Sequence, residues 1–461
     1  MENKFDLNIE KVLENWTVAD GIREVISNAM DEQILSNTKE IDIFENKDGW
    51  HIRDYGRGVH YKHLTQNENQ EKLNNPEKVI GKFGVGLKDA FATFDRYGIQ
   101  IKIISRHGSI TTQKFEKHGF KDVKTLHAII DESSADKNFQ GTEIILKGCS
   151  KKDMDAAKSN FLKFSQSKIL EKTKLGEIYE KTDKQAIIYI TGLKVATEEN
   201  YLFSYNITSM TAKLRKALNR ERSNVGRTAY SDRIMEILLQ SQTKPVAEQL
   251  VKDLQQFGAG EMHDEVSRVE VSVHACKLLN SFEKVVFATS FELIEKKELI
   301  DQAKKDGYKV IVIPDNVKEK IQGVKDIQGN PMIDLGQYVQ NFNESFEFKF
   351  IDEKQLNQKE QEIFSKTKQL LDLIGGKPAS VKKILITETM RLEANGFQPA
   401  GLWDYPNIII QRDQLKDLQT YAGVLLHEAT HATSGTSDVS REFEDALTEI
   451  IGKIALQTLE M

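Results

Sequence analysis

The feature that most constrains the fold is a short amphipathic segment near the N-terminus. Its apolar residues recur at the spacing of one helical face, and they are Ile22, Val25, Ile26, Ala29 and Met30. This spacing predicts a helix with one buried face. Glu24, Asn28 and Asp31 fall on the opposite side, so their side chains can reach a single ligand. Taken alone, such a polar row is more often a solvated helix face.

A predicted β-hairpin follows this helix and ends at a carboxylate. Residues 40–44 and 50–54 alternate apolar and polar side chains around a turn, which is the pattern of two paired strands. Asp54 closes the second strand and is followed by Gly56 and Gly58. Glycines at these positions allow the backbone to approach a flat ligand closely.

A second glycine-rich segment precedes another predicted helix. It contains Gly81, Gly84 and Gly86 and is followed by Lys88. A glycine-rich turn at a helix start presents amide groups to phosphate. Either glycine segment alone is more often a turn than a binding site.

Together and in this order, the three blocks resemble the N-box and the two glycine boxes of the GHKL ATPase superfamily, which includes gyrase B, heat-shock chaperones, histidine kinases and MutL. The matching patterns are Glu24-x3-Asn28-x2-Asp31, Asp54-x-Gly56-x-Gly58 and Gly81-x2-Gly84-x-Gly86. A later strand that begins at Gly141-Thr142 is similar to the Gly-Thr element of that superfamily. The resemblance covers about the first 165 residues and implies the Bergerat fold, a left-handed βαβ sandwich.

The resemblance also implies an ATP-binding site that uses Mg²⁺ and hydrolyses ATP. Glu24 corresponds to the general base that activates water, Asn28 to the Mg²⁺ ligand and Asp54 to the acceptor for the adenine amino group. Thr142 supports the adenine contact, Lys88 adds a charge near the phosphates, and the last glycine block forms a mobile lid. The remaining residues implied in nucleotide binding are Asp31, Gly56, Gly58, Gly81, Gly84 and Gly86. A glutamate at position 24 favours the hydrolysing branch over histidine kinases.

In the middle of the chain, two predicted strands, 186–190 and 201–207, precede a basic helical stretch from Thr211 to about Leu239. This order resembles the transducer domain of gyrase and MutL. In the transducer a basic residue reaches the γ-phosphate, and the candidates here are Lys213, Lys216, Arg220, Arg222 and Arg227. A solvated basic helix and a patch for nucleic-acid phosphate are the alternatives. Beyond it, two predicted buried strands, 285–288 and 309–314, indicate an α/β segment.

A second catalytic pattern lies near the C-terminus, on a helix predicted from Gln414 to Thr433. His427 and His431 are four residues apart, which places two imidazoles on one helical face, and Glu428 lies beside them. This HExxH pattern binds one Zn²⁺ and uses the glutamate to deprotonate the metal-bound water. The strand predicted at 407–410 supplies an edge against which zinc peptidases of the zincin class pair their substrate.

A third zinc ligand is needed to leave one position open for water. On the helix predicted from Arg441 to Leu456, Glu444 shares a face with apolar residues, so it is expected to point inward as a paired or metal-bound carboxylate. This arrangement resembles the gluzincins. Asp438 is the competing candidate, because Gly435-Thr436-Ser437-Asp438 is similar to the Gly-Thr-x-Asp element of aspzincins. Glu444 is the preferred choice.

Composition indicates where such a protein works and what it binds. The formal net charge of −6 gives no reason to expect nucleic acid, although a local basic patch is compatible with it. The two cysteines are far apart in sequence and indicate no disulfide framework. No apolar stretch approaches the ~20 residues needed to span a bilayer. We therefore expect a cytoplasmic protein without a membrane partner.

These observations predict an α+β chain with an ATPase at one end and a metalloprotease at the other. The expected domains are a Bergerat α/β sandwich (1–165), a transducer-like α/β domain (166–260), an α/β connecting region (261–350) and a zincin-like α+β domain (351–461). The expected cofactors are ATP, Mg²⁺ and Zn²⁺. The expected function is ATP-controlled zinc endopeptidase activity on a protein substrate, in bacterial defence or stress response, with homodimerisation on ATP binding. The alternatives are a MutL-like or microrchidia-like clamp on nucleic acid with a structural or inert zinc site, and a chaperone-like ATPase.

Overall fold

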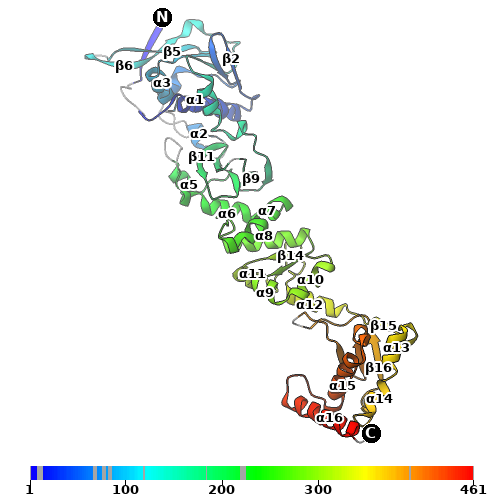
Figure 1. Ribbon diagram of the computed structural model, residues 1–461. Helices are drawn as coiled ribbons and strands as arrows, with labels where there is room; N and C mark the ends of the chain where they lie inside the picture. The colour runs from blue at the N-terminus through cyan, green and yellow to red at the C-terminus, as the bar shows by residue number, and fades with distance from the viewer. Residues whose placement is uncertain are drawn as a thin grey trace. The chain divides into compact units, whose positions relative to one another are not determined.

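The computed structural model describes residues 2–7, 14–65, 70–74, 79–80, 86–117, 120–182, 184–218, 225–393 and 396–459. Helices and mixed sheets alternate along the chain, which confirms the predicted α+β class (Figure 1). The chain divides into two compact units, Met1–Leu278 and Leu279–Met461. The four predicted domains are finer than this division, and their boundaries stay a prediction.

The first unit begins with an antiparallel seven-stranded sheet in the order β1-β6-β5-β4-β7-β3-β2 within the described residues. Its strands are β1 (Glu2–Asp6), β2 (Asp42–Asn46), β3 (Gly49–Arg53), β4 (Gln100–Ser105), β5 (Gly108–Lys117), β6 (Phe120–Asp131) and β7 (Thr142–Lys147). The helices among them are α1 (Val18–Ser36), α2 (Gln70–Asn74), α3 (Gly86–Arg96) and α4 (Lys151–Lys158). The hairpin predicted before Asp54 is confirmed as β2 and β3.

Helix α1 buries the predicted apolar face. Ile22, Val25 and Ile26 are fully buried and form one core with α3, α4 and the sheet (Figure 1). Thr17 begins the helix with a capping box shared with Asp20, which satisfies amide groups that have no partner inside the helix. The polar row of α1 is therefore held at a fixed orientation by the packing of its opposite face.

A second sheet completes the first unit, in the order β11-β10-β12-β9-β8. Its strands are β8 (Ile169–Lys172), β9 (Gly176–Glu180), β10 (Ala186–Ile190), β11 (Leu193–Glu198) and β12 (Phe203–Ile207). The helices that follow are α5 (Ala212–Ala217), α6 (Ser231–Leu239), α7 (Lys244–Leu254) and α8 (Val269–Phe282). β10 and β12 confirm the two strands predicted in this region.

The single basic helix predicted from Thr211 to Leu239 is wrong. Helix α5 ends at Ala217 because Leu218 takes an extended conformation, and α6 begins only at Ser231 after a short 3-10 turn. Gly226, just before the turn, has an extended ψ of 138°, so the helical conformation does not run into α6. Arg220 and Arg222 lie outside the described residues.

The second unit contains a parallel pair, β13 (Val285–Ala288) and β14 (Lys309–Val312), and a four-stranded sheet in the order β15-β16-β18-β17. The strands of this sheet are β15 (Phe350–Ile351), β16 (Lys383–Thr387), β17 (Gly401–Asp404) and β18 (Asn407–Gln411). The helices are α9 (Ser290–Glu295), α10 (Lys297–Lys305), α11 (Asp315–Ile321), α12 (Leu335–Glu344), α13 (Gln358–Phe364), α14 (Thr367–Asp372), α15 (Leu418–Ser434) and α16 (Arg441–Leu459).

Two expectations for the second unit need correction. The strand predicted at 407–410 is present as β18, but it lies inside the sheet, parallel to β16, and β17 is the edge strand next to it. The helix predicted from Gln414 begins at Leu418, because Asp417 caps it by accepting the amide of Thr420 at 2.8 Å.

None of the helices in the described parts of the chain is long and apolar enough to cross a membrane.

Candidate nucleotide and metal sites

A cavity of about 410 Å³ opens beside α1 in the first unit. This volume lies within the range of small-molecule sites. Five of the predicted nucleotide-binding residues line it, and they are Asn28, Asp54, Gly58, Gly86 and Thr142. Gly81 and Gly84 lie outside the described residues. The structure thus brings residues from all three sequence blocks, and from the Gly-Thr strand, to one cavity.

Asp54 is positioned by backbone groups at the end of β3. Its Oδ1 accepts hydrogen bonds from the amide N–H of Gly56 at 2.9 Å and of Thr142 at 3.2 Å. Burial raises the pKa of Asp54 to about 6, although these two amides oppose the shift. At neutral pH the group is an ionised acceptor in a fixed position. Thr142 lies beside it, with its hydroxyl oxygen accepting the amide of Val59 at 3.0 Å.

Gly141 makes this arrangement sterically feasible. Its φ is +82°, and a Cβ there would lie 1.9 Å from the carbonyl oxygen of Asp54. Gly98 offers a matched comparison, because its φ is +69° and nothing lies within 4 Å of its Cβ position.

We therefore expect Gly141→Ala to lower the free energy of unfolding by about 1–3 kcal/mol more than Gly98→Ala does. Both substitutions place alanine at a positive φ, but only the alanine at position 141 also clashes with the backbone of Asp54. Chemical denaturation of both variants measures the difference. Equal losses of stability would mean that Asp54 and Gly141 are less closely packed than the structure shows.

The polar row of α1 is only partly directed at the cavity. The Glu24 side chain is 13% exposed, and its carboxylate pairs with Arg23 at 3.2 Å. It also lies close to Gly86, because a Cβ on that glycine would be 2.4 Å from the carboxylate. Asn28 lines the cavity. Asp31, the last residue of the row, is fully buried and accepts a hydrogen bond from the Ile80 amide at 2.5 Å. It therefore anchors the backbone at Ile80, which follows α2 in the sequence.

An ion-paired cluster that the sequence pattern did not predict lies beside this row. Arg57 donates to Glu32 at 2.9 Å and to Glu71 at 2.9 Å, which ties α1, the segment after β3 and α2 together. A Cβ on Gly56 would lie 2.4 Å from the Glu32 carboxylate, so this glycine makes room for Glu32. Glu32 is four residues after Asn28, and that spacing was the available signal.

None of the described basic candidates for the γ-phosphate lines the cavity. Lys213 pairs with Asp232 at 3.2 Å. Arg227 pairs with Asp264 and lies 4.9 Å from the ring centre of Tyr201. Lys88 lies in the first turn of α3, where burial lowers its pKa, and it is not among the lining residues either.

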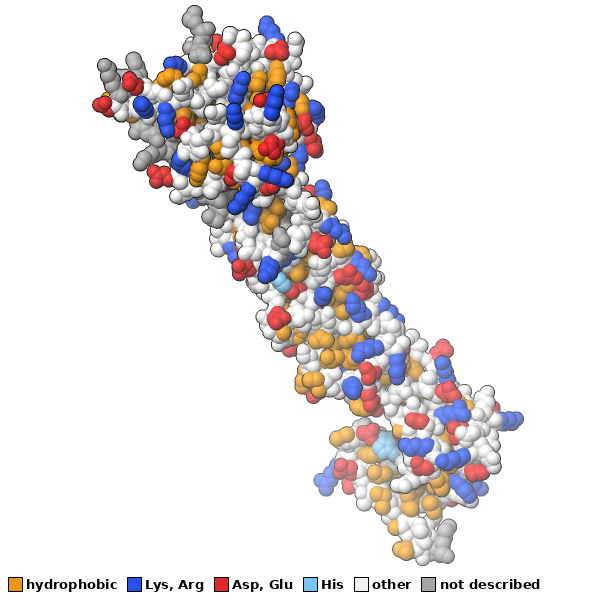
Figure 2. Space-filling model, turned by 45° about the horizontal axis from the view of Figure 1, so that its top comes forward, with side chains coloured by type: hydrophobic (Ala, Val, Ile, Leu, Met, Phe, Trp, Pro, Cys, Tyr) orange, Lys and Arg blue, Asp and Glu red, His pale blue; other side chains and the backbone are white. Residues whose placement is uncertain are grey.

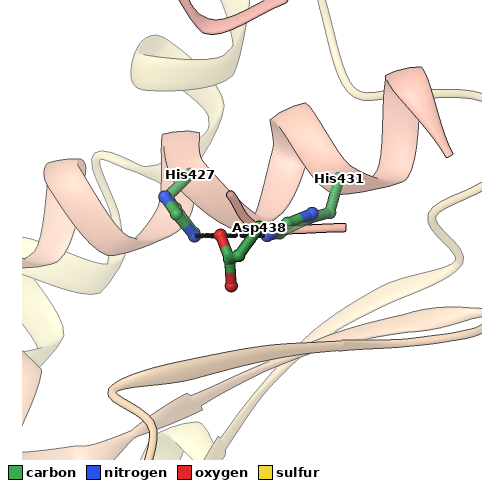
Figure 3. A group of neighbouring side chains, drawn as sticks. All are labelled: His427, His431 and Asp438. Carbon is green, nitrogen blue, oxygen red and sulfur yellow. Dashed lines mark hydrogen bonds and ion pairs between the residues drawn. The ribbon is translucent and has the colours of Figure 1, made fainter. Parts of the chain in front are cut away.

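Three side chains converge on one point at the end of α15 in the second unit (Figure 3). His427 Nε2 and His431 Nε2 are 3.2 Å apart, and Asp438 Oδ1 lies 3.1 Å from the first and 3.2 Å from the second. Donor atoms of a tetrahedral zinc site with 2.0–2.1 Å bonds are about 3.4 Å apart. The spacing and the donor types therefore fit a Zn²⁺ ion held by two imidazoles and a carboxylate.

Local geometry explains this convergence. Gly435 ends α15 with a φ of +68°, and the chain then turns back so that Asp438 faces the helix it has just left. The carbonyl oxygen of Thr436 accepts a hydrogen bond from His431 Nδ1 at 2.7 Å. This bond leaves the Nε2 lone pair of His431 available to a metal.

Glu428 lies next to the three donors and is 6% exposed. Burial raises the pKa of Glu428 to about 7. The backbone amide of Trp403 on β17 donates to its carboxylate. A Cβ on Gly401 would lie 2.7 Å from Glu428 Cγ, so a glycine at this place on the edge strand is what lets β17 approach α15. Glu428 is thus oriented by the edge strand itself.

The inward orientation predicted for Glu444 is wrong. Glu444 is exposed, because Phe443 takes the inward position of α16 and stacks on the His431 ring at 4.3 Å between ring centres. Neighbouring residues on a helix point about 100° apart, so both cannot face the histidines. The competing candidate, Asp438, is the carboxylate that the structure places beside them.

A cleft of about 840 Å³ surrounds the cluster. Its walls are β17, α15 and the segments 391–393, 399–400 and 435–438. His427 and His431 are the only histidines in the sequence of the second unit, and Figure 2 shows histidine at the surface of that unit beside acidic side chains. The cluster is therefore accessible to a substrate from solvent.

Comparisons with known proteins place the chain among relatives from a single species. Residues 152–244 match the family model described as the Mycoplasma pneumoniae MPN635 N-terminal domain. An uncharacterized protein of Mycoplasma pneumoniae (strain ATCC 29342 / M129 / Subtype 1) is 41% identical over 246 residues, which is 52% of this chain and 98% of the relative. Another uncharacterized protein of that strain is 27% identical over 335 residues, 67% of this chain and 93% of the relative. The chain belongs to the same family as the first of these Mycoplasma pneumoniae proteins.

Proposed function

We propose that this protein is an ATP-hydrolysing enzyme whose nucleotide site controls a zinc-dependent endopeptidase on the same chain. The observation that carries the proposal is the convergence of His427, His431 and Asp438 within 3.2 Å of one another, with the buried Glu428 beside them. Hydrolytic zinc sites use three protein ligands, an open position and a nearby general base.

In this proposal Asp438 replaces Glu444 as the third ligand. Zn²⁺ supplies Lewis-acid activation of a water molecule and of the scissile carbonyl. Glu428 accepts the proton of that water, because its carboxylate is held by the Trp403 amide next to the donor cluster. An extended peptide pairs with the outer edge of β17, at positions other than the Trp403 amide that already donates to Glu428, which brings its backbone along the cleft past His427.

The nucleotide half rests on the cavity beside α1. Asp54 and Thr142 provide the acceptor and hydroxyl for adenine, and Glu24 provides the general base. The Asn28 oxygen already accepts a hydrogen bond from an ammonium group, so its environment suits a cation such as the implied Mg²⁺. Gly86, at the start of α3, offers amide groups to phosphate.

The alternative of a nucleic-acid clamp has less support. It requires free basic side chains around Lys213 to Arg227, and these two end residues are paired with Asp232 and Asp264. Such pairs neutralise the charge that would attract a phosphate backbone. No observation favours the chaperone-like alternative.

Control of the peptidase by the nucleotide can be tested directly. We expect proteolysis of unfolded casein to differ between the nucleotide-free, ADP, ATP and non-hydrolysable-analogue states, because a ligand shifts a conformational equilibrium by its different affinities for the two states. Differences of about 5- to 150-fold correspond to ordinary coupling free energies. Zinc analysis of the same samples must show unchanged metal. Equal rates in all four states would leave two independent activities on one chain.

A further inference from the structure

Lys72 on α2 reaches into the polar row of α1. Its Nζ atom lies 3.0 Å from Asn28 Oδ1 and 2.7 Å from Asp31 Oδ2. The Asp31 side chain is fully buried and the Lys72 side chain is 11% exposed. A long, flexible cationic side chain is thus held in a largely buried position between an amide oxygen and a carboxylate.

Two consecutive residues tie α2 to the site. Lys72 contacts Asn28 and Asp31, while Glu71 pairs with Arg57, which in turn pairs with Glu32 of α1. Helix α2 is only five residues long. Short helices receive little stability from their own hydrogen bonds, so these polar contacts set its position.

The Lys72 ammonium donates to Asn28 Oδ1, which is the oxygen atom that the proposed function assigns as a ligand of the metal ion. Asn28 Oδ1 is the implied Mg²⁺ ligand, and a divalent cation bound there would repel an ammonium group at hydrogen-bonding distance from the same oxygen. Lys72 also lines the nucleotide cavity itself. The metal ion and the Lys72 ammonium therefore compete for the position beside Asn28 Oδ1.

We propose that Lys72 is an internal cation that occupies the metal position of the nucleotide site and must be displaced when a metal–nucleotide complex binds. The proposal rests on the proposed function, because it assigns Asn28 to a metal. Displacement of Lys72 breaks the contacts that it makes with Asn28 and Asp31, which tie α2 to α1. Nucleotide binding is thereby coupled to a change in the position of a specific element.

The test compares Lys72→Met, which keeps length without charge, with Lys72→Arg and with Lys102→Met, an exposed control on β4. Binding of a fluorescent ATP analogue is measured over a range of Mg²⁺ concentrations. We expect Lys72→Met to lower the Mg²⁺ concentration needed for half-maximal binding by about fivefold or more. Lys72→Arg and Lys102→Met should behave as the parent. Weaker binding at every Mg²⁺ concentration would instead make Lys72 a phosphate ligand and overturn the proposal, as would an unchanged Mg²⁺ requirement.

A nucleotide-free measurement separates this inference from the proposed function. Mn²⁺ binding is followed by electron paramagnetic resonance, and thermal unfolding confirms that each variant is folded. We expect tighter Mn²⁺ binding by Lys72→Met than by the parent. If that occurs while no variant binds nucleotide, the ATPase assignment fails and the competition between Lys72 and metal stands. Equal Mn²⁺ binding by Lys72→Met and the parent overturns the competition.

Discussion

Glu428→Gln should lose peptide cleavage by about 10²–10⁴-fold while retaining one zinc per chain. The amide is nearly the same size as the carboxylate, so the contact with the Trp403 amide and the close approach of Gly401 are preserved. In the proposed mechanism, only the ability to accept a proton from the attacking water is lost. Cleavage of a quenched fluorescent peptide and zinc analysis of the same sample measure the two properties.

The controls for this variant also decide the third ligand. Asp438→Ala should lose zinc, because it removes one of three donors that lie within 3.2 Å of one another. Glu444→Ala should keep both zinc and cleavage, because Glu444 is exposed. Loss of zinc in Glu444→Ala together with retention in Asp438→Ala would return the ligand role to Glu444.

Glu24→Gln should bind ATP as the parent does and hydrolyse it about 10²–10⁴-fold more slowly. The change removes the carboxylate proposed as the general base and keeps a side chain of the same shape against Gly86. Asp54→Ala should instead lose binding, because it removes the buried acceptor that the amides of Gly56 and Thr142 hold in place. Phosphate release and equilibrium binding of a fluorescent analogue distinguish the two effects.

A matched control for these variants is Glu45→Gln on β2, where the glutamate is exposed. It should change neither binding nor hydrolysis. Hydrolysis at the parent rate by Glu24→Gln would remove Glu24 from the role of base. Unaltered nucleotide affinity in Asp54→Ala would move the adenine site away from the end of β3.

Elements with a regular spacing of apolar residues were predictable from the sequence. The buried face of α1, the hairpin that ends at Asp54, and the helix that carries His427 and His431 all follow from periods of 3.6 or 2 residues. The ion pairs that the sequence pattern did not predict join residues that are distant in sequence. Arg57 with Glu32, and Lys72 with Asp31, are separated by 25 and 41 residues.

The sequence by itself therefore determined which residues share a helix face or end a strand, because those relations depend on backbone geometry over a few residues. It placed the two imidazoles together and put a carboxylate at the end of β3. The sequence left Asp438 as the alternative to Glu444, and only the structure decided that Asp438 faces the histidines, that Phe443 takes the inward position beside them, and that β17 is the edge strand. The conformation of an irregular segment after a helix, and the order of strands in a sheet, follow from no regular period of apolar residues.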